Sequence, residues 1–339
     1  MLVAYLSPRL CVKTSRSVGS HASDVHVNVL PGTSCQVMVE SIRHLIKQAN
    51  SFPWPPPSSF GLPFIIHNQP VGFIRNNVIQ HLPLDTFIVH ADSVMFSTSI
   101  SPESWTASIR KLLKEWRKSL ASTTPEFECL KGWRHEEYAV YTSHGEVLKI
   151  ERAAQGIFGI RSYGCHLNGY VIDQDGSMKM WIARRSYKKQ TWPGFLDNIV
   201  GGGLPAGVTP SENIIKECAE EANIPPEIAV LAKPVSAVSY FMDSPTRGLL
   251  PDSEYCYDVQ LPNTFIPQPQ DGEVHEFFLW DLKKVEQHLL TNEFMPESGL
   301  VIIDFLVRHG FITPENEPDY LDVVTDLRRK LPFPAPILS

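Results

Sequence analysis

Three acidic side chains lie within one turn of a predicted helix, shortly after a run of glycines. Glu217, Glu220 and Glu221 are spaced i, i+3 and i+4, so a helix over residues 209–223 places them on one side. Like charges at this spacing weaken an isolated helix by about 0.2–0.5 kcal/mol per pair. A divalent cation would turn the repulsion into coordination, because magnesium takes oxygen ligands and bridges carboxylates to substrate phosphates. Mg²⁺ is therefore the expected cofactor, with Mn²⁺ as the alternative.

The glycine run supplies the second half of this pattern. Gly202 and Gly203 have no side chains, so their backbone amides can approach phosphate oxygens closely. Thr209 and Glu212 form a capping box and Pro210 suits the first helical position, which predicts where the helix begins. The acids alone would indicate a solvated helix face, but the adjoining glycines favour metal-assisted phosphate chemistry.

Together the glycines and acids resemble the Nudix box, G-x5-E-x7-R-E-U-x-E-E-x-G-U, in which U is a bulky apolar residue. Read from Gly202, the sequence places all three helix glutamates in register, and the resemblance implies that Glu217, Glu220 and Glu221 hold the metal. Three positions depart from the pattern: Val208 replaces glutamate, Lys216 replaces arginine and Asn223 replaces glycine. The glutamate–arginine pair that supports the loop in the family cannot form here, whereas asparagine tolerates a left-handed helix end.

A narrower resemblance covers residues 36 to 325. Segments 181–186, 192–198, 238–240, 271–274 and 301–306, together with Lys189, resemble Nudix proteins related to the amino-terminal part of fungal thiamine pyrophosphokinases, a group with plant organellar members. This resemblance implies hydrolysis of thiamine diphosphate, or of its oxidised or damaged analogues, to the monophosphate. The expected partner is thus a small-molecule diphosphate.

The same resemblance implies that a metal-activated water attacks one phosphorus, with a carboxylate as general base. The candidate bases are Glu220 and Glu273, an acid at the start of a predicted strand; the alternative for Glu273 is a surface turn. Arg184, Arg185 and Lys189 are candidates for binding the diphosphate. Successive strand residues face opposite sides, so we expect only one of the two arginines to reach the site.

Two aromatic residues, Trp192 and Tyr240, are candidates for stacking on a substrate ring, with core packing as the alternative for each. His166 is interpreted as structural.

Two other functions remain open. Residues 184–198 also resemble isopentenyl diphosphate isomerases, which share the Nudix fold, but those enzymes use a cysteine just after this stretch and residues 199–203 contain none. The departures at Val208 and Lys216 would also permit an inactive binding or regulatory module. Retention of all three glutamates argues against that interpretation.

The surrounding sequence predicts the elements that must position these residues. Period-two patterns predict strands, and a turn at 173–176 predicts a hairpin; helical spacing marks the helices. The strands are expected near 64–67, 167–172, 178–184, 235–241, 255–261 and 274–280, and the helices near 38–49, 101–120, 209–223, 282–290, 298–309 and 320–331. The expected fold class is α/β (α+β), a Nudix-type mixed sheet between helices with a smaller amino-terminal α/β domain. The predicted divisions are 1–30, 31–148, 149–312 and a carboxy-terminal extension, 313–339.

Composition limits the remaining functions. A net charge of −7 argues against broad nucleic-acid binding, and no apolar run reaches the roughly 20 residues that a membrane span needs. Residues 1–30 contain Arg9, Lys13, Arg16 and several serines but no acid before Asp24, which is typical of a mitochondrial or other organellar transit peptide. The alternative is a disordered tail on a cytoplasmic protein. The sequence does not indicate an oligomeric state.

Overall fold

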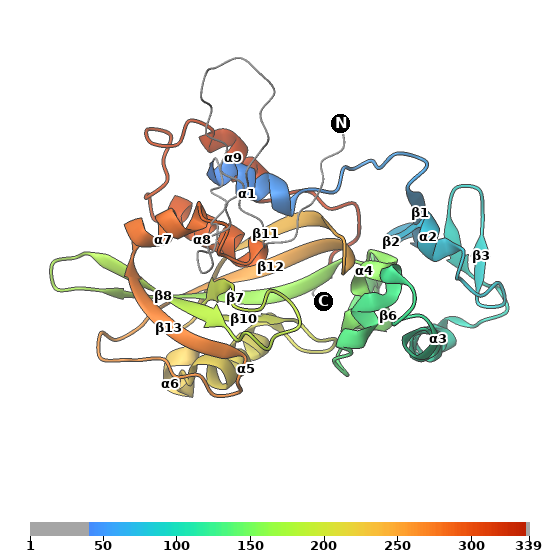
Figure 1. Ribbon diagram of the computed structural model, residues 1–339, viewed down its shortest axis with the longest axis horizontal. Coiled ribbons are helices and arrows are strands. Elements are labelled where there is room, and N and C mark those ends of the chain that lie inside the picture. Colours follow the sequence, from blue (N-terminus) through green and yellow to red (C-terminus); the bar gives the residue numbers. More distant parts are fainter. Residues whose placement is uncertain (1–40, 337–339) are drawn as a thin grey trace, which may run out of the picture.

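The computed structural model describes residues 41–336, so the predicted targeting segment at 1–30 lies outside the described residues. These residues form a smaller unit built mainly from the first half of the chain and a larger unit built around a mixed sheet (Figure 1). This matches the expected fold class. Within the described range, no helix has the length and apolar character needed to cross a bilayer.

The larger sheet has the strand order β11-β12-β7-β8-β13, with β10 paired to β7 and β9 paired to β8. Its strands are β7 (Ser162–Ile172), β8 (Met178–Arg185), β9 (Leu196–Asn198), β10 (Val200–Gly203), β11 (Lys233–Ser244), β12 (Gly248–Gln260) and β13 (Val274–Asp281). β12 and β7 are parallel, and the other pairs are antiparallel. The predicted turn at 173–176 joins β7 and β8, which pair only over their last and first residues, respectively. Beyond that pairing, β9 and β10 lie between the two strands.

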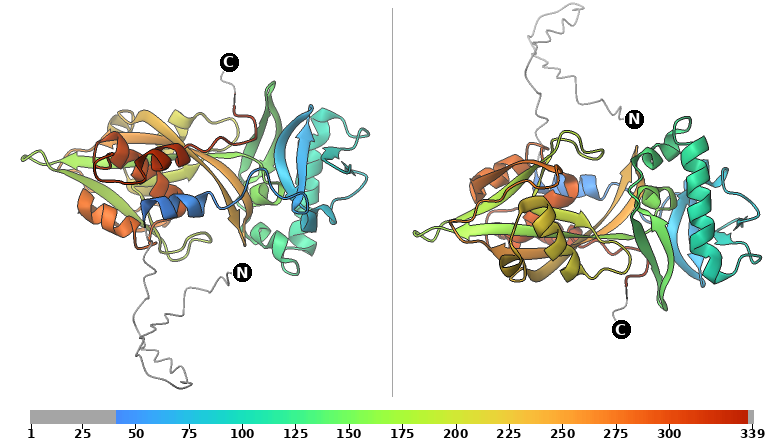
Figure 2. Two further views of the ribbon diagram at one scale, coloured as in Figure 1. Left: turned by 90° about the horizontal axis from the view of Figure 1, so that it is seen from above. Right: turned by 90° about the horizontal axis from the view of Figure 1, so that it is seen from below.

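Helices cover both faces of this sheet (Figures 1 and 2). One face carries α1 (Ile42–Ala49), α7 (Leu282–Leu289), α8 (Pro296–Arg308) and α9 (Tyr320–Asp326), and the other carries α5 (Pro210–Ala222) and α6 (Pro226–Ala229). Because both faces are covered, β7 and β8 are buried along most of their length. α8 lies at the centre of the first layer, and residues 297–306 are all buried.

The smaller unit packs one long helix and a four-stranded sheet around a second core. Its strands are β1 (Gly61–Ile66), β2 (Gln69–Arg75), β3 (Phe87–Val89) and β4 (Val94–Phe96), followed by the hairpin β5 (Glu137–Thr142) and β6 (Gly145–Glu151). Its helical elements are α2 (Asn76–Ile79), η1 (Pro102–Ser104), α3 (Trp105–Ser119), η2 (Pro125–Gly132), η3 (Arg152–Ala154) and α4 (Gln155–Phe158). The helix expected from residue 101 begins as a 3-10 turn and becomes α-helical at Trp105.

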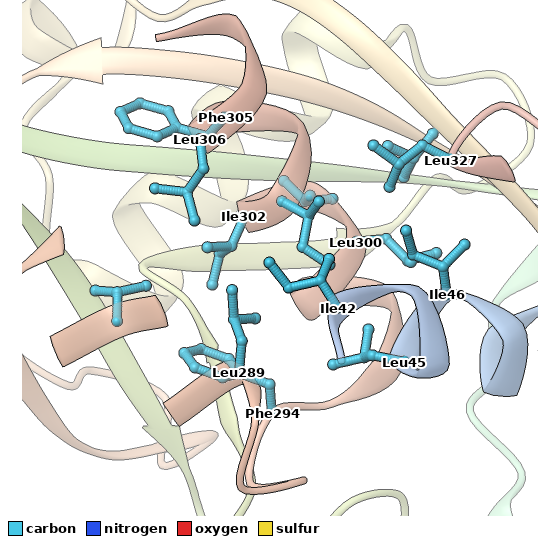
Figure 3. Close-up of a cluster of buried hydrophobic side chains, with 14 of the residues drawn as sticks. Ile42, Leu45, Ile46, Leu289, Phe294, Leu300, Ile302, Phe305, Leu306 and Leu327 are labelled. Atoms are coloured by element: carbon cyan, nitrogen blue, oxygen red, sulfur yellow. The ribbon is translucent and has the colours of Figure 1, made fainter. Parts of the chain in front are cut away.

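The predicted domain limits differ from this arrangement in two places. They place α1 in the smaller unit, but Ile42, Leu45 and Ile46 are buried against α8 in the core of the larger unit (Figure 3). Each such buried side chain contributes about 1.5–3 kcal/mol relative to an exposed one. The predicted division at residue 148 falls inside β6, so the smaller unit extends past it.

An aromatic cluster joins the two units. Phe52 follows α1 and packs against Phe241 of β11, with ring centroids 4.5 Å apart, and against Phe73 of β2 at 5.9 Å. Phe333, near the end of the described chain, lies 6.0 Å from Phe241. Side chains from both units therefore share one buried cluster, which fixes how the units face each other.

Candidate active site

A cavity of about 890 Å³ lies between the two units and includes most of the residues singled out in the sequence. The larger unit contributes residues of β7, β8, β10, β11, β12, α5 and α8, and the loops at 189–192 and 271–273. The smaller unit contributes residues of η2, η3, α4, the start of β5 and the loop at 134–136. The candidate chemistry on α5 therefore faces a second wall made by the smaller unit.

The predicted helix start positions the acids of α5. Thr209 and Glu212 form both hydrogen bonds of the capping box, and Pro210 is the first helical residue. Asn223 ends the helix with φ 52°, the left-handed conformation that asparagine tolerates. The short helix is thus fixed at both ends, which holds its acidic face against β10.

The three glutamates of α5 do not share one environment. The Glu217 side chain is 15% exposed and the Glu220 side chain 48%, and both line the cavity. Burial raises the pKa of Glu217 above its ordinary value. Glu221 is buried and accepts a hydrogen bond from the Gly201 amide at 2.9 Å. It does not line the cavity. In this structure the Glu221 carboxylate supports the backbone of β10, and its role as a metal ligand stays a prediction.

Lys216 shows that Glu217 and Glu220 can share a cation. Its Nζ lies 3.3 Å from Glu217 Oε1 and 2.6 Å from Glu220 Oε2. Across residues 41–336 there is no group of three or more His, Cys, Asp or Glu side chains arranged to hold a metal ion. The two carboxylates nevertheless fit a divalent cation in donor type, and the lysine ammonium already occupies a position between them.

The glycines form part of a strand, β10. Gly202 pairs with Cys165 and Gly203 with Gly164 of β7. A Cβ atom on Gly202 would lie 2.6 Å from Glu217 Cδ, and one on Gly203 would overlap the Tyr138 hydroxyl and lie 3.0 Å from Arg152 Cζ. Both glycines line the cavity, and their missing side chains make room for these charged groups.

Of the two successive arginines, only Arg185 lines the cavity, as strand alternation predicts. Its Nη1 is 2.6 Å from Asp197 Oδ2, and both side chains are buried. Arg184 points elsewhere, donating to the Gly194 carbonyl at 2.8 Å and pairing with Glu293 at 3.3 Å. Arg184 is therefore not positioned to bind a ligand in this cavity, and Arg185 is the one of the two candidates that faces it.

Lys189 and Glu273 both line the cavity and form an ion pair with each other. Burial opposes ionisation of Glu273, but Lys189 and, more weakly, Arg134 and Arg185 outweigh it and lower its pKa. Glu273 is thus ionised at neutral pH and neutralised by a lysine that could also bind phosphate.

The two aromatic candidates differ. Trp192 is half-buried at the cavity wall, where its ring packs edge-on against Phe195 at 5.1 Å. Tyr240 is 1% exposed, and its ring belongs to the main core. Its hydroxyl donates to Asp252 Oδ2 at 3.0 Å and to Glu254 Oε1 at 3.3 Å. Tyr240 therefore acts as a core residue with a polar tip, not as a surface on which a ring can stack.

The sequence interpretation missed a second acidic group, which we call the acidic floor: Asp252 and Glu254 on β12 and Glu297 on α8. Burial raises the pKa of all three carboxyls. Glu297 Oε2 is buried and has no hydrogen-bond partner in the described chain. Its nearest cation, Arg247 Nη1, lies 3.9 Å from Oε1. The i, i+2 spacing of Asp252 and Glu254 was the available signal, because it puts both on one strand face.

His166, interpreted as structural, also lies in the cavity wall. Its Nδ1 is 2.9 Å from Asn198 Oδ1 and its Nε2 is 3.7 Å from Glu254 Oε2. Burial lowers its pKa, although Asp197 opposes the shift. The imidazole is therefore neutral at physiological pH and adds no positive charge to the acidic floor.

Comparisons with known proteins find two family models that match successive regions of the chain. The profile of the NUDIX domain matches residues 167–298, and that of a domain of unknown function, DUF4743, matches residues 42–162. "Nudix hydrolase 24, chloroplastic" of Arabidopsis thaliana is 38% identical over 275 residues, which cover 79% of this chain and 72% of that protein. "Uncharacterized protein YJR142W" of Saccharomyces cerevisiae is 43% identical over 222 residues, covering 61% of this chain and 64% of that protein. The crystal structure of DR0079 from Deinococcus radiodurans aligns with a TM-score of 0.38 at 22% identity, covering 52% of this chain and 100% of that one.

Proposed function

The chain belongs to the Nudix hydrolase family, and on that premise we propose that it hydrolyses the phosphoanhydride bond of a small-molecule diphosphate with a divalent cation. The observation that carries this proposal is the pair Glu217 and Glu220, which share a cation at the wall of a large cavity. Carboxylates that hold Mg²⁺, or Mn²⁺, beside bound phosphates are a recurrent arrangement for phosphate chemistry.

Glu217 and Glu220 would hold the metal, with Glu221 as the third predicted ligand, whose carboxylate also supports β10 through the Gly201 amide. The metal, when bound, lowers the pKa of a coordinated water and neutralises charge on phosphate oxygens. Lys216 would have to release the two carboxylates as the metal enters. Its long, flexible side chain, about half exposed, can turn to solvent at little cost.

Lys189 and Glu273 would separate when the diphosphate binds. The phosphate oxygens attract the Lys189 ammonium, which frees the Glu273 carboxylate to accept a proton from the attacking water. Glu220 is the second candidate base, because it lines the same cavity from α5. Arg185 lines the cavity and would donate hydrogen bonds to the phosphates while Asp197 holds its guanidinium in place.

For the substrate, we propose thiamine diphosphate or its oxidised or damaged analogues, which would leave as monophosphates. The acidic floor supports a nitrogen heterocycle, since a buried carboxylate oxygen without a partner favours an N–H donor or a positive charge. Trp192 could stack on such a ring from the cavity wall.

A panel of diphosphates tests this function. The purified chain would be incubated with Mg²⁺ and thiamine diphosphate, its oxo and oxy analogues, nucleoside diphosphate sugars or dinucleotides, and the released phosphates would be measured. We expect monophosphate from the thiamine compounds, strong loss in Glu220→Gln, and no change in Glu286→Gln, an exposed acid on α7. Binding without hydrolysis of any compound would support the inactive module. An isomerised product without phosphate release would support the isomerase.

We also propose an organellar location, a mitochondrion in the first instance. The composition of residues 1–30 supports it, and two relatives from Arabidopsis thaliana are named as chloroplastic. A fluorescent fusion of the full chain should enter an organelle, and the same fusion with Arg9, Lys13 and Arg16 replaced by glutamine should remain outside. Equal cytoplasmic signal for both fusions would contradict the proposal.

A further inference from the structure

The region matched by the domain of unknown function forms one wall of the cavity that contains the metal-site glutamates. It contributes two guanidinium groups, Arg134 after η2 and Arg152 at the start of η3. The hairpin β5–β6 holds them together: Glu151 Oε1 accepts the Arg134 backbone amide at 2.8 Å, and Glu136 Oε1 lies 3.1 Å from Arg152 Nη1. These contacts hold the Arg152 guanidinium and the backbone of Arg134 at the wall of the cavity that α5 and β10 also line.

Arg134 differs from the other cationic residues of the cavity. Within residues 41–336 its guanidinium makes no ion pair and no side-chain hydrogen bond, although the residue is partly buried. The other lysines and arginines that line the cavity all lie within ion-pair distance of a carboxylate, among them Lys131, Arg152, Arg185, Lys189, Lys216 and Arg247. A partly buried guanidinium without an anion is a ready partner for one that arrives with the substrate.

The position of the two arginines indicates which anion this is. Arg152 lies beside Gly203 of β10, since a Cβ atom on Gly203 would lie 3.0 Å from Arg152 Cζ, and it lines the same cavity as Glu217 and Glu220. Arg134 lines that cavity together with Lys189 and Glu273. Both guanidiniums thus border the cavity in which the diphosphate is expected to bind. Guanidinium forks match phosphate oxygens in a bidentate manner, whereas a lysine offers only a point charge.

We propose that the smaller unit is a substrate-binding domain, which holds the diphosphate of the substrate through Arg134 with Arg152 beside it. This inference rests on the proposed function and adds the residues outside the Nudix box that bind the phosphates. It gives the domain of unknown function a specific role, in which the larger unit provides the metal site while the smaller unit closes the cavity and holds the anion in place.

Binding of a non-hydrolysable diphosphate tests the proposal without relying on activity. Methylenediphosphonate with Mg²⁺ would be titrated calorimetrically into the full chain and into Arg134→Gln, Arg134→Lys and Lys118→Gln. Lys118 is exposed on α3 of the same unit and serves as a charge-matched control. We expect about tenfold weaker binding for Arg134→Gln, equivalent to about 1.4 kcal/mol. Arg134→Lys should lose part of the affinity because the fork is missing, and Lys118→Gln should match the wild type.

Kinetics with a hydrolysed diphosphate should show the same pattern, with KM about tenfold higher in Arg134→Gln and kcat within about twofold. Equal diphosphonate affinity in wild type and Arg134→Gln, or no binding to the wild type, would overturn the inference. If hydrolysis is then intact, the proposed function still stands. Arginine-dependent binding without hydrolysis of any diphosphate would leave the inference standing and refute the function. If Arg134→Gln melts at a lower temperature than the wild type, the diphosphonate affinity of Arg134→Lys tests the inference instead. Partial loss of affinity in Arg134→Lys supports the inference, and wild-type affinity overturns it.

Discussion

Two groups of acids border the same cavity and differ in almost every physical respect. The glutamates of α5 that face the cavity, Glu217 and Glu220, keep contact with solvent and share the Lys216 ammonium. The acidic floor, Asp252, Glu254 and Glu297, is buried, and Arg247 reaches it only at 3.9 Å, while Glu297 Oε2 has no hydrogen-bond partner within the described residues. Identical carboxyl groups thus lie in two settings, one able to exchange a cation with solvent and one shielded from it.

This difference separates two roles. A carboxylate that already holds a mobile cation can exchange it for a hydrated metal, which arrives with its own water ligands. A buried carboxylate with an unpartnered oxygen is costly in its charged form, so it gains most from a ligand that donates hydrogen bonds or brings positive charge. We therefore assign the chemistry to α5 and the recognition of the organic group to the acidic floor.

The largest expected effect comes from neutralising Glu217, one of the predicted metal ligands on α5. Glu217→Gln should lower kcat on a hydrolysed diphosphate at least about 100-fold, because loss of a metal ligand removes several kcal/mol of transition-state stabilisation. Steady-state kinetics across a Mg²⁺ titration would measure it, with the exposed Glu286→Gln as the control. A Glu217→Gln enzyme with wild-type kcat would remove the distinction between the two acid groups.

Neutralising Glu297 of the acidic floor should have a smaller effect, which is confined to substrate selectivity. Glu297→Gln keeps the shape of the side chain but removes its charge, so it should raise KM for thiamine diphosphate about five- to tenfold. KM for inorganic diphosphate, which has no organic group, should stay unchanged. Comparing the two KM ratios is the measurement. The same factor for both substrates would mean that Glu297 does not recognise the organic group.

The smallest effect concerns stability and its pH dependence. Burial, followed by the neighbouring Asp252 and Glu297, raises the pKa of Glu254 in the folded chain. The folded state then binds the proton more tightly than the unfolded state, so this group destabilises the fold as pH rises above about 4.3. Glu254→Gln should therefore raise Tm by about 2–4 °C at pH 8 and change it little at pH 4.

Thermal melts in EDTA at both pH values would measure this difference, with Glu286→Gln as the exposed control. A Tm for Glu254→Gln below that of the wild type at pH 8 would show that the ionised floor stabilises the empty protein. In that case the floor would resemble the α5 acids, and the comparison would fail.

Local patterns in the sequence predicted the elements but not their partners. The capping box of Thr209 and Glu212 and the hairpin turn at 173–176 depend on neighbouring residues, and the structure confirms both. The apolar spacing of residues 42–49 predicted α1 equally well, yet nothing local states that it covers α8. The acidic floor brings together residues of β12 and α8, which are far apart in the sequence. Arg134 stands out only because no carboxylate within the described residues pairs with its guanidinium. Both are tertiary facts, which no spacing rule encodes.

The position of α1 has a practical consequence for how this enzyme can be divided. A fragment that begins at residue 149 contains every residue of the Nudix box but loses the helix that packs on Leu300 and neighbouring side chains (Figure 3). The uncovered part of α8 would expose apolar side chains to solvent, and such a fragment should aggregate on expression. A soluble minimal version would have to graft residues 41–52 back on, for example through a linker to the shortened chain's own amino terminus.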